Sequence, residues 1–231
     1  MPRPRLPLIA VLAAGAAGLA ACGGASGGDG SSATPTETPT ASSQTANGCR
    51  KVGPPAPKPD AKLAKPTTRL AAAKTWVATV TTSCGAFEIA LDVKDSPRTS
   101  ASFASLAARR FYDGTTFHRI VPGFVIQGGD PKGNGEGGPG YSVVEPPPRH
   151  VRYTPGVVAM AKTQFEASGT SGSQFFVVTG TKYQFAPEYA LLGRISGGQA
   201  TVDRIAAADA DARSGVPASP IVIDSIRVAS T

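Results

Sequence analysis

The chain has 231 residues and a formal net charge of +7, a basic balance that would suit a nucleic-acid-binding protein. Residues 74–231, the region expected to fold, carry only fifteen Lys and Arg against thirteen Asp and Glu, with no basic face that includes interleaved aromatic residues. With two histidines in the whole chain, no metal site of the usual ligand spacing can be built, so we expect no nucleic acid, metal or cofactor as a ligand.

Residues 1–21 have the pattern of an export signal. Arg3 and Arg5 precede an apolar run that is too short and too rich in small residues for a membrane-spanning helix. The run ends in L-A-A-C-G-G, which resembles the lipobox of bacterial lipoproteins, in which the cysteine, here Cys22, is acylated and becomes the new N-terminus. An ordinary signal peptide followed by a chance cysteine is the alternative. The lipobox predicts an extracytoplasmic chain, lipid-anchored to the outer face of the bacterial cell membrane.

Residues 22–73 are predicted to form a tether that begins at the lipidated cysteine. Between Gly23 and Gly48, 22 of 26 residues are Gly, Ser, Thr, Pro or Ala, and such a composition buries too little apolar surface to offset its ordering entropy. A flexible coil of this length has an r.m.s. span of roughly 25–30 Å. The stretch from Lys51 to Lys65 is rich in Pro and Lys and is expected to be stiffer and extended.

Acylation of one of the three cysteines would leave Cys49 and Cys84. Outside the cytoplasm such a pair is expected to oxidise. The bond would tie the tether to the turn after the first predicted strand and would stabilise the fold by about 2–4 kcal/mol. Two free thiols are the alternative.

Residues 74–231 are predicted to fold as a single domain with many short strands and two helices. The first helix should have Ser96 as its N-cap and Pro97 at its first position. The second helix is predicted over 199–208 and the last strand over 221–228. The other strands are expected near Trp76, Phe87, Phe117, Phe124, Val157, Phe175 and Leu191. This pattern is typical of a closed β-barrel with helical caps.

Two stretches carry the candidate site. The first contains F-H-R-I-V-P-G-F-V-I-Q-G-G-D, in which two short apolar strands flank a Pro122-Gly123 turn and include Arg119. The second contains M-A-K-T at 160–163 and G-T-S-G-S-Q-F-F-V-V-T at 169–179. Together they resemble the signature of the cyclophilins, the barrel-shaped peptidyl-prolyl isomerases. The resemblance implies a mainly β fold, a closed antiparallel eight-stranded barrel capped by two α-helices.

Isomerisation of an X-Pro bond requires neither a nucleophile nor a metal. Its barrier of about 18–20 kcal/mol reflects the partial double-bond character of the C–N bond. An enzyme can lower this barrier by holding the proline ring, excluding water and donating a hydrogen bond to the nitrogen of the twisted bond. The resemblance makes Arg119 the catalytic donor. The alternative is a structural arginine whose stem is buried and whose charged end reaches solvent.

The resemblance also assigns the substrate-binding residues. It places Phe124, Val125, Phe176 and Phe185 in the proline pocket, Gln127 beside substrate and arginine, Gly135, Ala161, Lys162, Thr163 and Gln174 along a peptide groove, and Gln184 and Tyr189 at the pocket rim. For the phenylalanines, ordinary core packing is the alternative. Alternation separates Phe175 from Phe176, because consecutive strand residues point to opposite faces.

From these residues we predict a monomeric peptidyl-prolyl isomerase that assists the folding of exported, proline-containing polypeptides. The runner-up is a non-catalytic module of the same fold, a tethered lipoprotein that binds or holds peptides. One observation argues against this non-catalytic module. The chain retains a full set of site residues that a module without activity would not need: Arg119, Phe124, Gln127, Gln174 and Phe176.

Overall fold

The computed structural model describes residues 47–59 and 61–231. All described residues belong to one compact unit. The predicted signal, the predicted lipidation site Cys22 and the first half of the predicted tether lie outside the described residues. No helix in the described ranges is both long enough and apolar enough to cross a membrane.

The described part of the chain contains short strands and two helices, as predicted. In chain order they are β1 (Trp76–Thr82), β2 (Gly85–Leu91), α1 (Pro97–Ala108), β3 (Thr115–Thr116), β4 (Arg119–Val121), β5 (Val125–Gly128), β6 (Val143–Val144), β7 (Val157–Met160), β8 (Thr170–Ser171), β9 (Phe175–Val178), β10 (Leu191–Gly197), α2 (Gln199–Ala206) and β11 (Val222–Ser230). The strands predicted at Val157, Phe175 and Leu191 are confirmed, whereas Phe117 lies between two strands.

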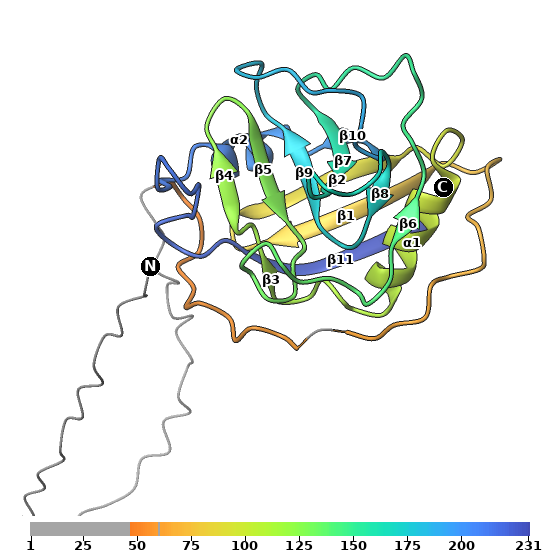
Figure 1. The fold of residues 1–231 in the computed structure, drawn as a ribbon. Coiled ribbons are helices and arrows are strands. Elements are labelled where there is room, and N and C mark those ends of the chain that lie inside the picture. Colours follow the sequence, from red (N-terminus) through yellow and green to blue (C-terminus); the bar gives the residue numbers. More distant parts are fainter. Residues whose placement is uncertain (1–46, 60) are drawn as a thin grey trace, which may run out of the picture. The chain divides into compact units, whose positions relative to one another are not determined.

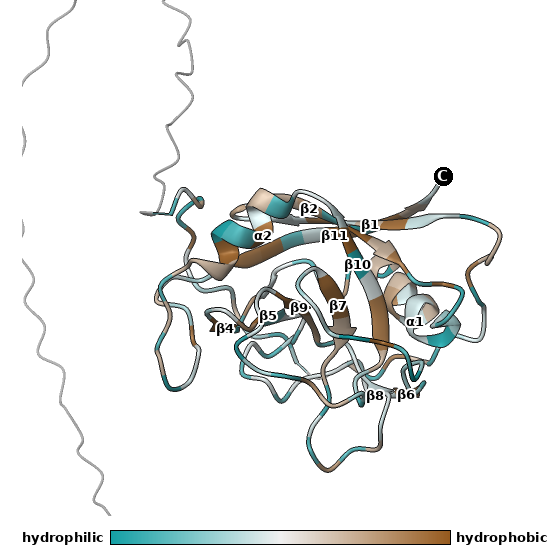
Figure 2. Ribbon diagram, turned by 90° about the horizontal axis from the view of Figure 1, so that it is seen from above, coloured by the Kyte–Doolittle hydropathy of each residue, from teal (hydrophilic) through white to brown (hydrophobic). Residues whose placement is uncertain are grey.

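Nine strands form one curled antiparallel sheet in the order β3-β11-β1-β2-β10-β7-β9-β5-β4, and β6 pairs with β8. The long strands β1, β2 and β11 cross the domain at a steep angle to β4, β5 and β9 (Figure 1). The two helices lie at opposite ends of the domain (Figures 1 and 2).

The prediction of a closed eight-stranded barrel is not confirmed, because the nine-stranded sheet stays open between β3 and β4. Only Phe117 and His118 separate these two edge strands in the sequence, so the edges must lie close together. The two edges pair with loop residues instead of with each other: Ile120 of β4 donates its N–H to the Gly215 carbonyl at 2.7 Å, and Thr116 of β3 forms an isolated antiparallel bridge with Asp130, in the loop after β5. Loop residues thus satisfy the edge that a closed barrel would pair.

Helix α1 starts at Pro97, as predicted, but its N-terminal cap differs from the prediction. The Ser96 side chain makes no capping hydrogen bond. The Glu145 carboxylate instead accepts the N–H groups of Arg98 and Thr99, at 3.1 and 2.8 Å. A carboxylate at this end satisfies free amides and complements the helix dipole.

Strands β5, β7 and β9 bury side chains on both faces of the sheet. One face, with Ile126, Met160 and Phe175, belongs to the main core. The other face, with Val125 and Phe176, belongs to a second, smaller apolar cluster. Apolar residues concentrate on the strands (Figure 2). The predicted opposition of Phe175 and Phe176 is therefore confirmed, and the smaller cluster is available to form a site.

Residues 50–59 and 61–73, here called the strap, run along the outside of the domain in an extended path (Figure 1). Half-buried positions recur at every third residue, Val52, Pro55 and Lys58. This is the period of a polyproline II helix that contacts a surface along one edge. The extended conformation agrees with the sequence analysis, whereas the contacts with the domain carry no local sequence signal.

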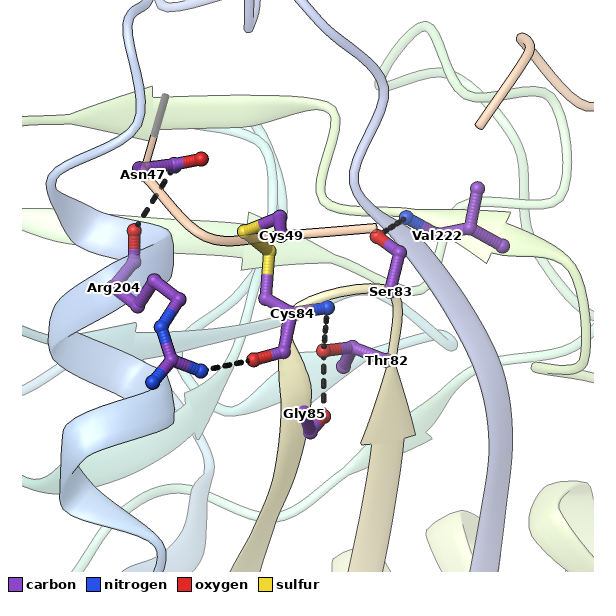
Figure 3. The surroundings of a disulfide bond; sticks show 8 residues. All are labelled: Asn47, Cys49, Thr82, Ser83, Cys84, Gly85, Arg204 and Val222. Atoms are coloured by element: carbon purple, nitrogen blue, oxygen red, sulfur yellow. Dashed lines mark hydrogen bonds between the residues drawn. A yellow bond between two sulfur atoms is a disulfide. The ribbon is translucent and has the colours of Figure 1, made fainter. Parts of the chain in front are cut away.

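A disulfide bond joins Cys49, just before the strap, to Cys84 in the turn between β1 and β2, 35 residues away in the sequence. Figure 3 shows this bond beside α2, where Arg204 donates a hydrogen bond to the Cys84 carbonyl. Arg50, the first residue of the strap, donates its N–H to the Ser83 carbonyl at 2.7 Å, and its guanidinium forms an ion pair with the Asp224 carboxylate at 2.9 Å. The start of the strap is thus held by covalent, backbone and ionic contacts.

Candidate active site

The hairpin formed by β4 and β5 positions the candidate catalytic arginine. Its Pro122-Gly123 turn, predicted from the sequence, is closed by a 3.0 Å hydrogen bond from the Phe124 N–H to the Val121 carbonyl. Gly123 has a φ of +70°, which glycine adopts without the strain of a side chain. The tight turn sets the register in which Arg119 lies opposite Gln127.

Strand register then places a row of side chains on one face of the sheet. Arg119 pairs with Gln127, Gln127 with Phe176, and Phe176 with Ala159. Residues directly opposite each other in antiparallel strands point to the same face. The next row on this face is apolar, with Val121 opposite Val125 and Val125 opposite Val178. A polar donor and an amide therefore border an apolar patch.

The apolar patch includes a stack of aromatic rings. The ring of Phe185 lies 4.6 Å from that of Phe124 and 5.2 Å from that of Phe176, with interplanar angles of 20° and 10°. Tyr189 meets Phe176 edge-on at 5.3 Å. All four predicted pocket residues, Phe124, Val125, Phe176 and Phe185, belong to this cluster or pack against it.

The Tyr153 hydroxyl holds Tyr189 in place. It donates to the Tyr189 carbonyl at 2.5 Å and accepts the Tyr189 N–H at 3.1 Å. Burial, as the main cause, raises the pKa of Tyr153 to about 12, so the hydroxyl remains a donor across the physiological range. Sequence reasoning missed Tyr153, because it lies 36 residues from its partner in a segment without strand or helix periodicity.

The rim of the pocket differs from the sequence-based assignment. Gln184, which was assigned to the rim, is exposed. Its neighbour Tyr183 instead meets the Phe124 ring edge-on at 4.9 Å, while 52% of its surface remains exposed. The sequence did contain a signal for this contact, because Tyr183 is an aromatic residue directly before Gln184. The loop conformation decides which of the two reaches the pocket.

Arg119 is half-buried, and strand register places it on the face of the sheet that carries Gln127 and Phe176. The stem packs beside Gly215, where an added Cβ would lie 3.0 Å from the Arg119 Cγ. Arg119 belongs to none of the ion pairs formed among the described residues. Its guanidinium has five N–H donors in a rigid planar arrangement, which suits the orientation of a carbonyl or an amide.

We call the row of Arg119, Gln127 and Phe176 the arginine row. Two glutamine amides connect this row to a neighbouring loop. Gln127 Nε2 donates to Gln174 Oε1 at 3.1 Å. Gln174 Nε2 in turn donates to the carbonyls of Gly135 and Gly137, at 2.9 and 3.1 Å. We call residues 130–141 the wall loop. The fully buried Asp130 carboxylate shapes this loop by accepting the N–H groups of residues 132, 134 and 135.

The wall loop forms one side of a groove of about 700 Å³ next to the arginine row. The groove brings together the predicted residues Gln127, Gly135, Ala161, Lys162, Thr163 and Gln174. Glu166 also lines it and was missed by sequence reasoning. Its carboxylate accepts the Thr163 N–H at 2.6 Å, which orders the loop that follows β7.

Lys162 borders the groove, but its ammonium is turned into the protein. Only 4% of its side chain is exposed, and Nζ lies 3.3 Å from the Glu188 carboxylate. It also donates to the carbonyls of Thr163 and Glu166, both at 3.2 Å, and lies over the Tyr189 ring. Lys162 therefore connects the two loops around the site and does not present its charge to a ligand.

His118 lies behind the wall loop, with Nε2 3.9 Å from the position of a Cβ at Gly135. Burial lowers its pKa, and the nearby Asp130 charge opposes this shift only in part. The imidazole is therefore neutral at neutral pH. No group of histidine, cysteine and acidic side chains in the described ranges could hold a metal ion.

Comparisons with known proteins agree with this geometry. A family model described as cyclophilin type peptidyl-prolyl cis-trans isomerase/CLD matches residues 77–228. Peptidyl-prolyl cis-trans isomerase B of Streptomyces anulatus is 37% identical over 169 residues, which cover 65% of this chain and 95% of that protein. Peptidyl-prolyl cis-trans isomerase A of Mycobacterium tuberculosis is 34% identical over 172 residues, which cover 67% of this chain and 92% of that protein.

Among solved structures, a cyclophilin type peptidyl-prolyl cis-trans isomerase of Cryptosporidium parvum, crystallised in the presence of the dipeptide Ala-Pro, has a similar fold. The TM-score is 0.62 at 30% sequence identity, and the match covers 67% of this chain and 99% of that one. The similarity thus extends over nearly the whole of that protein and over about two thirds of this chain.

Proposed function

Because this chain belongs to the cyclophilin family and is a peptidyl-prolyl cis-trans isomerase, we propose that it assists the folding of exported polypeptides at the outer face of the cell membrane. The observation that carries the catalytic part is the row of Arg119, Gln127 and Phe176 across three strands. Beside an apolar patch it sets an arginine that forms no ion pair with any other described residue.

The reaction at this site requires only positioning and a hydrogen-bond donor. The proline ring packs against Val125 and Phe176, which keeps water away from the C–N bond. As the bond twists, its nitrogen becomes pyramidal and its lone pair becomes available to the Arg119 guanidinium. This contact is stronger in the twisted state than in either planar isomer, so it lowers the barrier instead of only tightening binding.

The peptide on either side of the proline lies in the groove bordered by Gln127, Gln174 and Ala161. The use of Ala-Pro with the Cryptosporidium parvum isomerase supports a proline-containing ligand for this chain as well. A chain that acts on unfolded polypeptides has no need of a second subunit, and we propose that it acts as a monomer without nucleic acid.

Two features support a location outside the cytoplasm. Residues 1–21 have the pattern of an export signal followed by the lipobox cysteine Cys22. The disulfide between Cys49 and Cys84 is of a kind that persists in oxidising compartments and is rare in the cytosol. A lipid on Cys22 would hold the domain at the membrane through a tether.

Two measurements test this function. In cells fed a labelled fatty acid, the wild-type chain should carry the label and remain with the membrane fraction, whereas Cys22→Ser should lose both. A soluble, unlabelled wild-type product would contradict the anchor. In a protease-coupled assay, the purified chain should accelerate isomerisation of an Xaa-Pro peptide. A chain that only suppresses aggregation and has no such activity would favour the non-catalytic holdase instead.

A further inference from the structure

We propose that the strap is a positioning element of the isomerase site, acting through the wall loop and Gln174. The strap lies upstream of the expected domain boundary at residue 74 and lines neither the groove nor the aromatic pocket. Its contacts nevertheless fall on the loop that holds Gln174. The proposal rests on the isomerase activity and is independent of the membrane location.

Two backbone hydrogen bonds connect the strap to the wall loop. The Lys58 N–H donates to the Pro131 carbonyl and the Leu63 N–H to the Pro139 carbonyl, both at 2.9 Å. Ala61 lies between these two strap residues. A side chain at Gly140 would collide with the Ala61 carbonyl oxygen, so the strap and the wall loop touch through their backbones. The strap therefore holds the wall loop near both of its ends from the outside.

The inner side of the same loop holds the site. The carbonyls of Gly135 and Gly137, which lie between the two strap contacts, accept the hydrogen bonds from Gln174. Gln174 accepts the hydrogen bond from Gln127, which lies opposite Arg119. A continuous set of hydrogen bonds and strand pairing thus leads from the strap to the arginine row.

The wall loop depends on such external contacts because of its composition. Five of its twelve residues are glycine, and ordering glycine has a higher entropic cost than ordering any other residue. The loop has neither a helix nor a paired strand of its own. Without the strap, the loop would be held in its first half by the Asp130 carboxylate and at its last residue by Tyr141, whose hydroxyl hydrogen-bonds to Ser102, with little to restrain the residues between them. The carbonyls that orient Gln174 would then sample many positions.

The strap is itself firmly held at this point. The Lys58 ammonium donates to the carbonyls of Phe111, at 3.0 Å, and Asp113. The side chains of Ala61 and Leu63 pack against the main core. The disulfide at Cys49 anchors the upstream end. A segment fixed at several points can restrain the loop it touches.

The test compares Leu63→Pro with Leu63→Ala in the full chain. Both lose the leucine side chain, but only the proline removes the N–H that bonds to Pro139, and the extended strap accommodates proline. We expect Leu63→Pro to reduce kcat/KM for an Xaa-Pro peptide by about three- to tenfold relative to Leu63→Ala, mainly through KM. Equal kinetics of the two variants, measured well below their unfolding temperatures, would overturn the proposal.

A second comparison separates positioning from general stability. In a Gln174→Ala background, the difference between Leu63→Pro and Leu63→Ala should shrink to less than about twofold, because the residue through which the strap acts is gone. An undiminished difference would also overturn the proposal. Activity of the wild-type chain is a separate result, so failure of the isomerase function and failure of the strap role remain distinguishable.

If Leu63→Pro does not fold, Lys58→Met supplies the same test at the other contact. It keeps an apolar stem of similar length but loses the ammonium that holds the strap to the Phe111 and Asp113 carbonyls. Lys62→Met is the matched control, because Lys62 is exposed on the same segment. Lys58→Met should raise KM and Lys62→Met should not; equal KM values would overturn the proposal.

Discussion

Arg119 lies directly opposite Gln127 in the β4–β5 ladder, and both face the side of the sheet that carries Phe176. Adjacent strands are about 4.8 Å apart, so the donor, the amide and the apolar wall lie within roughly two strand spacings. An Xaa-Pro dipeptide, at most about 7 Å long, fits within this distance. Hydrogen-bond donation can therefore be tested at Arg119, and packing against the proline ring at the aromatic residues.

Removal of the Arg119 guanidinium should act mainly on kcat. Arg119→Ala should lower kcat by about 10²–10³-fold, the usual loss for one preorganised donor, with a smaller change in KM. Arg119→Lys keeps the charge but loses the planar donor arrangement, and should recover little of the rate. A protease-coupled assay at several peptide concentrations separates the two constants. An Arg119→Lys enzyme close to wild type would contradict the role.

Phe185 should limit the size of the proline pocket. Its ring stacks on both Phe124 and Phe176, so Phe185→Leu should open space for the ligand at the loss of about 1 kcal/mol of stacking. We expect a lower KM for Xaa-Pro peptides together with a lower unfolding temperature. Phe124→Ala is the comparison, because it removes a wall and should raise KM. A higher KM in Phe185→Leu would show that the ring is itself a required wall.

Stability should fall as the solution becomes acidic, in part through His118. Burial lowers its pKa in the folded state below the unfolded value of about 6.5. Well above pH 6.5, His118 is neutral in both the folded and the unfolded state, and its contribution to stability is fully present. As the pH falls below about 6.5, His118 binds a proton in the unfolded state first, so the free energy of unfolding decreases. Urea unfolding at pH 5 to 8 measures this. His118→Gln should weaken the pH dependence; an unchanged slope would exclude His118 as its source.

The disulfide should contribute strongly to stability and only indirectly to activity. The purified exported chain should show no reactive thiol from Cys49 or Cys84 before reduction. Reduction should lower the free energy of unfolding by about 3–4 kcal/mol, the loop-closure value for a bond across 35 residues. Because the bond lies away from the pocket, the isomerase should remain active with a moderately raised KM. Native protein with two free thiols, or complete loss of activity on reduction, would contradict this.

The sequence by itself determined what depends on neighbouring residues. Pro122-Gly123 specifies its turn because of the backbone conformations that proline and glycine favour, and the alternation of a strand separates Phe175 from Phe176. The start of α1 follows from Pro97, which suits the first position of a helix. The family signature located Arg119 and the residues around it, because that motif lies in two continuous stretches.

Only the tertiary structure decided what depends on distant partners. Glu145 rather than Ser96 caps α1, Tyr183 rather than Gln184 reaches Phe124, and Lys162 turns towards Glu188. The sheet stays open because loop residues pair with its two edge strands, and the strap packs on the wall loop through backbone atoms. Such contacts join segments far apart in the sequence, several of them through backbone groups that almost every residue carries, so no local pattern of side chains records them.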